Sequence, residues 1–336
     1  MVMAGGGFRF GYYLGIYAAM RQQNKTPDLL LASCGGAIAA GIIQAFSDDA
    51  QRKAWICSPE MYQFWLEMKS SQQASIGRAL TAALRRGLST KSAHKIPDLF
   101  NDYLFEIPAE LPVPPTSHPN QDSEVAIIAG KLLFTEDEPG QLRGSRKLFA
   151  EIVFCTPRAA ALLAGMQSPM SAEKGGGNAI AHDVLTDVNM PLAQAARASV
   201  SDMFYFRCHS YQGSHYIGGV IDLFPIEIAH RLAEQVIMEF KGPYDKLFSI
   251  PALRSVLGIN GNQRLQHVLK QHADLWFDTS DMEQELLENQ IGKKIAWQRN
   301  RIELRMPSSY EAYVKMIEAQ WKYGFQRGLS AFSRLV

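Results

Sequence analysis

The stretch LLLASCGGAIAAGII, from Leu29 to Ile43, decides the fold of this chain. It begins with three bulky apolar residues, continues through Ser33 in a turn of small residues, and then places Ala, Gly and Ile at helical spacing. This order predicts a short strand, a sharp turn and a helix, which is how several hydrolase folds present a nucleophilic serine. The usual pattern is Gly-x-Ser-x-Gly, and here Leu31 stands where the first glycine belongs. Ser33 is therefore either a nucleophile or a small residue where strand and helix pack closely.

The segment before this stretch shows the same order of elements. Val2 to Ala4 predicts a short buried strand, three glycines follow it, and residues 12–22 carry apolar side chains along one helical face. Strand, helix, strand and helix with short connections predict a parallel α/β sheet that is buried on both faces. From Lys241 onward the pattern predicts mostly amphipathic helices.

Composition excludes several classes of function. The 336 residues are 47% apolar and 20% charged, which is ordinary for a globular protein. A net charge of +1 gives no excess of cations for phosphate contacts, so we expect no nucleic-acid partner. The four cysteines lack CxxC spacing, which argues against a zinc site or a disulfide framework.

The apolar pattern predicts a cytoplasmic protein. The N-terminal residues do not combine a charged region, an apolar run and a cleavage site. No apolar run reaches the roughly 18 residues that a membrane-spanning helix needs. We therefore expect any contact with the inner face of a membrane to be peripheral.

The segment GGGFRFG, from Gly5 to Gly11, offers backbone N–H groups at the start of a helix, which is an arrangement that binds anions. A dinucleotide site would need glycine where Phe10 stands, and the acidic residue expected after the second strand is absent. The segment is therefore an oxyanion hole or a structural turn.

A third region narrows these alternatives. The segment AARASVSDMFYF spans Ala195–Phe206, and YIGGVIDLFPIEIA begins at Tyr216. Taken in order with the glycine turn and the serine turn, these segments resemble the patatin-like phospholipase family over about residues 1–235. The resemblance implies an α/β/α sandwich of three layers with a mainly parallel central sheet. It also implies an acyl hydrolase domain over residues 1–235, with a helical C-terminal extension over residues 236–336 packed on the same domain.

The resemblance implies hydrolysis of lipid acyl esters by a Ser-Asp dyad, with no metal and no organic cofactor. Ser33 is the implied nucleophile, and its partner aspartate is the general base. Backbone N–H groups of the glycine turn stabilise the tetrahedral oxyanion, and an arginine supports that turn. The residues that match these oxyanion positions are Gly5, Gly6, Gly7 and Arg9.

Three motif positions depart from the family pattern. Phe10 replaces the glycine that ends the oxyanion motif, Leu31 replaces a glycine before the serine, and Ile217 replaces the dyad aspartate. The third change has the largest consequence, because isoleucine cannot take a proton and a positioned base contributes roughly 10²–10⁴ in rate.

Two nearby residues are candidates to replace the missing base. Asp222 lies five residues after Ile217, where the family block holds a second acid that is normally structural. His215 lies two residues before Ile217, so on a strand both side chains point to the same face. Asp202 is a weaker candidate.

Two functions therefore stay open. The chain is a patatin-like esterase or phospholipase that uses Ser33 with a non-standard base, or it is a catalytically inactive lipid-binding or regulatory protein that keeps the pocket. The basic segment from Arg78 to Arg86 has an apolar stripe, so it either faces a membrane near the site or covers the core. The sequence pattern does not predict an oligomeric state.

Overall fold

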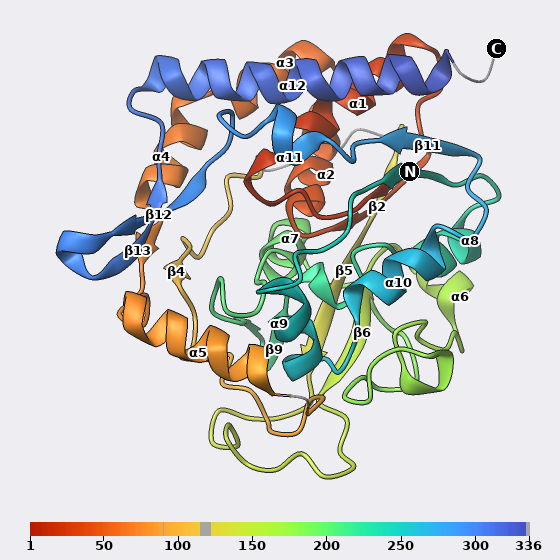
Figure 1. Cartoon of the computed structure of the whole chain (residues 1–336). Coiled ribbons are helices and arrows are strands. Elements are labelled where there is room, and N and C mark those ends of the chain that lie inside the picture. Colours follow the sequence, from red (N-terminus) through yellow and green to blue (C-terminus); the bar gives the residue numbers. More distant parts are fainter. Residues whose placement is uncertain (90, 115–121, 334–336) are drawn as a thin grey trace.

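The computed structural model describes residues 1–89, 91–114 and 122–333, and it arranges them in layers around a central sheet (Figure 1). The sheet runs in the order β1-β2-β5-β6-β7, with β9 pairing β5 and β8 pairing β9. Its seven strands in the described residues are β1 (Val2–Met3), β2 (Leu29–Ser33), β5 (Glu124–Leu132), β6 (Phe149–Phe154), β7 (Leu185–Asp187), β8 (His209–Tyr211) and β9 (Ser214–Ile217).

The sheet is mixed in direction. Strands β1, β2 and β5 are parallel, and β7 is parallel to β6, whereas β6 and β9 run antiparallel to β5. Both β2 and β9 pair with β5, and their registers place Ser33 opposite Ile128 and Ile217 opposite Gly130. The ends of β2 and β9 therefore meet at one point of the sheet.

The sheet separates two hydrophobic cores, because successive residues of a strand point to opposite faces. In β2, Leu30 and Ala32 belong to the first core, and Leu31 belongs to the second. The helices on the first face are α1 (Gly11–Gln22), α2 (Gly35–Ala45), α7 (Leu192–Ser199) and α12 (Tyr310–Phe332). The helices on the second face are α6 (Pro157–Leu163), α8 (Ile226–Leu232), α9 (Ser249–Val256) and α10 (Gly261–Val268).

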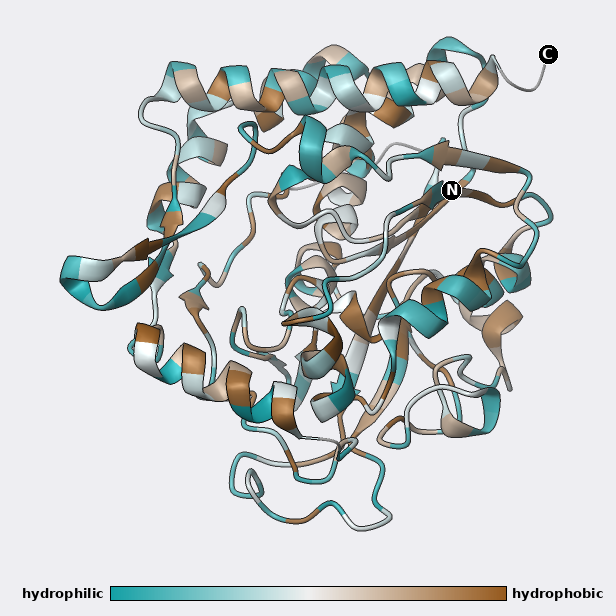
Figure 2. Cartoon of the chain, viewed as in Figure 1, coloured by the Kyte–Doolittle hydropathy of each residue, from teal (hydrophilic) through white to brown (hydrophobic). Residues whose placement is uncertain are grey.

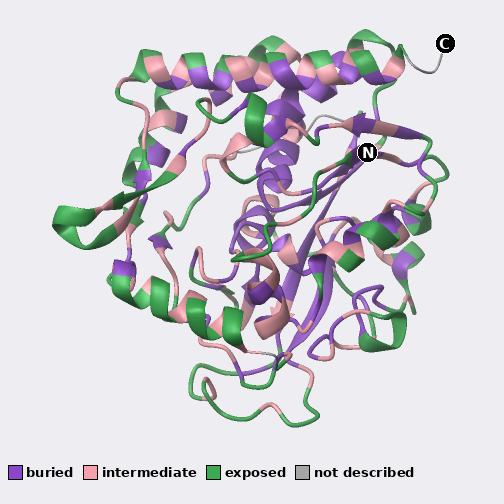
Figure 3. Cartoon of the chain, in the orientation of Figure 1, coloured by how far each residue is buried: buried purple, intermediate pink, exposed green. Residues whose placement is uncertain are grey.

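This arrangement confirms the predicted three-layer α/β sandwich. The two strands and two helices predicted near the N-terminus are present as β1, α1, β2 and α2, with bounds that differ by at most two residues. The sheet is buried between its helical layers (Figure 3), and its strands are apolar along most of their length (Figure 2).

Three helices and a small sheet complete the region between β2 and β5. These elements are α3 (Asp49–Ile56), α4 (Pro59–Glu67), β3 (Lys69–Ser70), α5 (Ile76–Leu88) and β4 (Phe105–Glu106). The side chains of Asp48, Ser58 and Ser75 cap the three helices by accepting from backbone N–H groups of the first turn. No helix in the described ranges is long and apolar enough to cross a membrane.

The C-terminal region contains strands as well as the predicted helices. Its further elements are β10 (Ile237–Phe240), β11 (Leu275–Asp278), α11 (Met282–Glu285), β12 (Gly292–Ala296) and β13 (Arg301–Arg305). The mostly helical pattern predicted from Lys241 onward does not include strand β11 or the exposed hairpin of β12 and β13.

The C-terminal region packs directly on the N-terminal segments. Helix α12 lies along α1 at the top of the view (Figure 1). The hydroxyls of Tyr12 and Tyr13 donate to the two carboxylate oxygens of Glu239 at 2.5 and 2.7 Å. These contacts join α1 to β10 inside the protein.

Candidate active site

The turn between β2 and α2 is centred on Cys34. Its backbone angles are φ 50° and ψ −123°, a conformation that residues with a side chain seldom adopt. Holding a side-chain-bearing residue there costs on the order of 1–3 kcal/mol. Such strain is typical of the sharp strand-to-helix turn that exposes a nucleophile. Cys34 is therefore the residue that occupies the turn, and Ser33 is the last residue of the strand.

The thiol of Cys34 faces a carboxylate. Its Sγ donates to Oδ2 of Asp202 at 3.2 Å, and its backbone N–H donates to Oγ of Ser199 at 2.9 Å. The Ser199 hydroxyl in turn donates to the carbonyl oxygen of Ile128 on β5 at 2.6 Å. Ser199 thus ties the backbone of the turn to the central strand.

Asp202 reaches this position because Gly218 has no side chain. A Cβ built on Gly218 would lie 2.1 Å from Oδ1 of Asp202. Asp202 follows α7, and Gly218 follows β9 at the point where β9 approaches the end of β2. A glycine in one segment therefore makes room for an acid from another.

Burial raises the pKa of both members of this pair. Desolvation raises the pKa of Asp202 to about 7, although the Cys34 thiol and the Val220 N–H oppose this rise. Desolvation and the charge of Asp202 raise the pKa of Cys34 above its ordinary value, while the Gly35 N–H lowers it. No salt bridge among the described residues includes Asp202. At neutral pH the proton therefore stays on sulfur, and Asp202 is close to half ionised.

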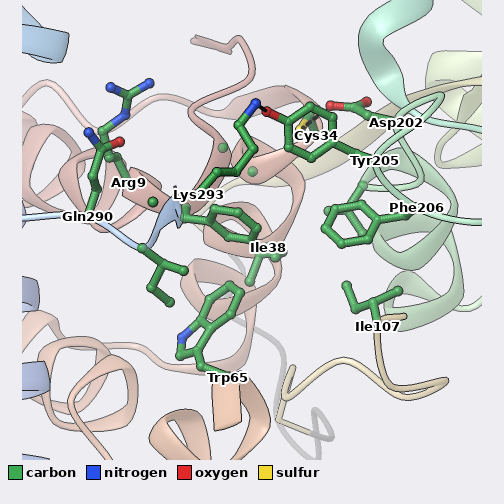
Figure 4. A pocket seen from close by; sticks show the side chains of 16 residues that line it. Arg9, Cys34, Ile38, Trp65, Ile107, Asp202, Tyr205, Phe206, Gln290 and Lys293 are labelled. Carbon is green, nitrogen blue, oxygen red and sulfur yellow. Dashed lines mark hydrogen bonds between the residues drawn. The ribbon is translucent and has the colours of Figure 1, made fainter. Parts of the chain in front are cut away.

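Cys34 and Asp202 lie together at one end of a cavity of about 440 Å³ (Figure 4). Ile38, Trp65 and Phe206 form an apolar wall of this cavity, and Arg9 lies at the other end. The described residues that line the cavity include Cys34 but not Ser33. The cavity therefore offers an apolar slot that ends at a thiol–carboxylate pair.

The glycine turn contributes to the same cavity through Gly7 and Arg9. Gly7 has φ 56° and lies beside α2, where a Cβ on Gly35 would be 2.7 Å from the Gly7 carbonyl oxygen. Gly5 and Gly6 lie behind it, and the Gly5 carbonyl accepts a hydrogen bond from Nζ of Lys241. The turn thus brings one of its three predicted oxyanion glycines to the cavity.

Arg9 lines the cavity with a weak ion pair. Its Nη2 lies 3.7 Å from Oε1 of Glu283, whose side chain is exposed. Its Nε is buried and has no hydrogen-bond partner within the described part of the chain.

The C-terminal region supplies one wall of the cavity, from Gln290 to Lys293. Gln320 of α12 connects this wall to the glycine turn. Its side-chain Nε2 donates to the carbonyl oxygens of Phe8 at 3.3 Å and Asn289 at 2.8 Å, and its Oε1 accepts from the Gly11 N–H at 3.2 Å. The side chain of Gln320 is fully buried.

The predicted nucleophile, Ser33, lies behind the cavity. Its side chain is 1% exposed, and its hydroxyl donates to the backbone carbonyl of Asp222 at 3.1 Å. Strand alternation places it on the face of Leu31, towards the second core. The structure therefore brings Ser33 to Asp222 through a backbone oxygen and not through the carboxylate.

The two predicted replacement bases have other partners. The carboxylate of Asp222 accepts from Nη2 of Arg264 at 2.9 Å, and the same guanidinium also binds Glu227. Nδ1 of His215 lies 2.8 Å from Oγ of Ser210 on the neighbouring strand, and its ring packs against Phe100. Neither side chain lines the cavity within the described ranges.

Ile217 is fully buried in the second core. Its Cγ1 lies 2.8 Å from where a Cβ on Gly130 would be, so it fills the space above that glycine. The position that the resemblance assigns to the dyad aspartate is a core position in this structure.

Cys34 is absent from the predicted site residues, although the sequence holds a signal for it. If the pattern Gly-x-nucleophile-x-Gly is moved by one residue, Ala32 takes the first position, Cys34 the third and Gly36 the fifth. The small Ala32 then replaces the first glycine, and the bulky Leu31 no longer needs an explanation. No group of three or more His, Cys, Asp or Glu in the described residues could hold a metal ion.

The family model described as patatin-like phospholipase matches residues 1–230. A comparison with curated proteins finds no match. The matched range contains the turn at Cys34, the glycine turn and Asp202, and it ends before the wall from Gln290 to Lys293.

Proposed function

This chain belongs to the patatin-like phospholipase family, a family of lipid acyl hydrolases, and we propose that it hydrolyses lipid acyl esters with Cys34 as nucleophile and Asp202 as general base. One observation carries this proposal. The Cys34 thiol lies on the strained strand-to-helix turn, inside the cavity, 3.2 Å from a carboxylate with a pKa of about 7.

The first half of the reaction acylates the thiol. Ionised Asp202 takes the proton from Sγ of Cys34, and the sulfur attacks the ester carbonyl carbon. The tetrahedral oxyanion collapses and expels the alcohol, which receives the proton held by Asp202. The acyl group is then joined to Cys34 as a thioester.

The second half releases the fatty acid. Asp202, again ionised, takes a proton from a water molecule, and the resulting hydroxide attacks the thioester carbonyl. The collapse of this second intermediate expels the Cys34 thiolate, which takes the proton from Asp202. The thiol and the carboxylate return to their starting states.

Backbone N–H groups around Cys34 support the oxyanion. The first N–H groups of α2 have no intrahelical partner, and the helix N-terminus favours negative charge. Gly35 begins α2, and Gly7 lies beside it at the cavity. We assign the oxyanion contacts to these two residues, with Gly5, Gly6 and Arg9 supporting the turn.

Cys34 is a better candidate than Ser33 for a geometric reason. The Ser33 hydroxyl is held by a backbone carbonyl and faces the second core, where it has no carboxylate or imidazole partner among the described residues. Asp202 supplies at Cys34 the base that Ile217 no longer supplies. The nucleophile and its base thus come from new positions of the same fold.

The alternative function is an inactive lipid-binding or regulatory protein that keeps the cavity. The raised pKa of the Cys34 thiol favours this alternative, because the thiolate is the reactive form of cysteine. In either case a free thiol at this position suits a reducing compartment such as the cytoplasm, and the other three cysteines are also free.

Acyl trapping tests the proposal. Incubation with p-nitrophenyl esters followed by mass spectrometry should find a hydroxylamine-sensitive acyl adduct on Cys34. Cys34→Ala should lower the hydrolysis rate about 10³-fold or more, as loss of a nucleophile does in serine hydrolases. Ser33→Ala is the matched control, and it should keep the rate within about threefold and cost about 1 kcal/mol of stability for one lost hydrogen bond.

Two results would contradict this assignment. An acyl adduct on Ser33, with activity lost only in Ser33→Ala, would return the role to the serine. Absence of any adduct and of any turnover in the parent protein would favour the inactive alternative.

A further inference from the structure

Helix α5 turns its large apolar side chains outward. Leu80, Leu84 and Leu88 are spaced by four residues and therefore share one helical face. Their exposed fractions are 54%, 63% and 82%. The half-buried residues on the opposite, inward face are mostly small: Ala79, Ala82 and Ala83. The helix thus reverses the usual pattern, in which the bulky apolar residues face the core.

The hairpin of β12 and β13 extends this surface. Its exposed apolar residues are Ile295 at 51% and Trp297 at 73%. Ser75 and Arg301 form an isolated bridge, and the N–H of Ile76 donates to the carbonyl oxygen of Asn300 at 3.3 Å. The start of α5 and the hairpin therefore touch, and both lie at the same edge of the molecule (Figure 1).

Both segments are basic. Residues 76–88 and 292–301 contain no Asp or Glu, although acidic and basic residues nearly balance in the chain as a whole. Their cations are Arg78, Arg85, Arg86, Lys293, Lys294, Arg299 and Arg301. Lys294 and Arg299 pair with Glu303, whereas Arg78, Arg85 and Arg301 are among the exposed residues. Exposed cations thus surround the exposed apolar side chains.

We propose that residues 76–88 and 292–301 form a docking surface for an anionic lipid bilayer. Leucine, isoleucine and tryptophan side chains would enter the interface, as they do in amphipathic helices that lie on membranes. The arginines and lysines would meet anionic headgroups, each contributing about 1 kcal/mol near the surface. Tryptophan is enriched at the headgroup level because its ring is amphipathic.

The docking surface is continuous with the candidate active site. Gly292 and Lys293 belong to the hairpin and also line the cavity. On the other side, the guanidinium of Arg86 on α5 lies 3.7 Å from the ring centre of Phe204. In the sequence, Phe204 stands between the two cavity residues Asp202 and Tyr205. A bilayer held here would lie next to the cavity wall. The link to lipid substrates rests on the proposed function, whereas the docking itself does not.

Vesicle sedimentation tests the docking surface on the intact chain. The protein should bind phosphatidylcholine vesicles that contain phosphatidylglycerol, bind pure phosphatidylcholine vesicles more weakly, and dissociate as salt is raised. Leu84→Glu should lower the partition coefficient about tenfold or more, because it removes a leucine that would be buried in the bilayer and adds a negative charge that anionic headgroups repel. Leu162→Glu on α6 is the matched control, since Leu162 is 40% exposed outside this surface, and it should bind as the parent does.

Hydrolysis of a soluble p-nitrophenyl ester separates the two proposals. Leu84→Glu should leave this rate unchanged, which also shows that the variant is folded. If the parent hydrolyses the ester but ignores anionic vesicles, or if Leu84→Glu binds them as tightly as the parent does, the docking surface is overturned. If the parent binds anionic vesicles through Leu84 but hydrolyses no ester, the docking surface stands and the proposed function falls.

Discussion

Two aspartates lie near the turn that follows β9, and they have different partners. Asp202 comes from the segment after α7, and Asp222 follows the turn itself. Asp222 is almost fully buried, and its carboxylate lies 2.9 Å from the guanidinium of Arg264. Asp202 is only partly buried, lines the cavity and faces the Cys34 thiol without a cation. Desolvation raises the pKa of both, and only at Asp222 does an arginine oppose that rise.

The comparison shows how the neighbours of a buried carboxylate set its pKa. Burial lowers the pKa of Arg264, but Asp222 and Glu227 outweigh this and raise it above its ordinary value. The cluster is thus held in its charged state. Asp202 lacks such a partner, and desolvation raises its pKa to about 7, close to neutral pH. An uncompensated carboxylate can exchange protons, whereas a paired one holds the fold together.

The largest effect is expected from Asp202→Asn. The rate of ester hydrolysis should fall about 10²–10⁴-fold, because a general base is lost. Stability at pH 8 should rise by up to about 4 kcal/mol, since the pKa rise from 3.8 to about 7 means that the ionised carboxylate destabilises the fold. Steady-state kinetics and urea unfolding measure the two effects. A variant that loses both activity and stability would make Asp202 structural, as Asp222 is.

Arg264→Gln should lower the stability of the protein, whereas Asp202→Asn should raise it. It leaves the Asp222 carboxylate buried without its cation, and we expect a loss of about 3–5 kcal/mol in unfolding free energy. Adding Asp222→Asn should recover much of this loss, because the unpaired charge is then gone. Urea unfolding of the single and double variants checks this, and no recovery in the double variant would show that Asp222 does not depend on Arg264.

Ile217→Asp places an acid at the position that the family uses for its base. Because Ile217 is fully buried against Gly130, a carboxylate there should cost about 3 kcal/mol and should not raise the rate of ester hydrolysis. Thermal unfolding and kinetics on the same sample test both expectations. A large gain in rate would mean that Asp202 does not serve as the base.

The pH profile gives the smallest effect. Asp202 must be ionised to act, so kcat/KM should fall about tenfold for each pH unit below about 7 and level off above it. Asp202 affects stability in the opposite direction, since its raised pKa favours the folded state at low pH, where activity is lost. It is complete below its ordinary pKa of 3.8 and is lost as pH rises through about 7. A rate that stays constant between pH 5 and 8, by contrast, would exclude this base.

The sequence predicted the fold where the apolar pattern is local. Strand β2 and helix α2 follow from an apolar run and helical spacing, and both are present. The hairpin of β12 and β13 was not predicted, because β12 does not alternate between apolar and polar residues, and β13, which does alternate, has only five residues, three of them charged. Exposed strands carry little of the signal on which such predictions rest.

The site was harder to predict because it depends on a single residue of register. Ser33 is the last residue of β2 and lies outside the cavity lining, whereas Cys34 lies in the turn after the strand and lines the cavity, so the proposed nucleophile differs from the predicted one by a single residue. Asp202 was only a weaker candidate in the sequence, because its place beside Cys34 depends on Gly218, which lies in a different segment. Contacts between segments far apart in sequence leave no local pattern.

The amide of Gln320 has a consequence for how substrate range could change. Because one buried side chain joins α12, the glycine turn and residue Asn289 before the cavity wall, it holds the glycine turn and that wall at a fixed separation. A substitution at Gln320 should therefore shift this wall relative to the glycine turn while leaving the contact between the Cys34 thiol and Asp202 in place. Under the proposed function, the range of acyl groups would then depend on a residue of α12, which lies outside the matched residues 1–230.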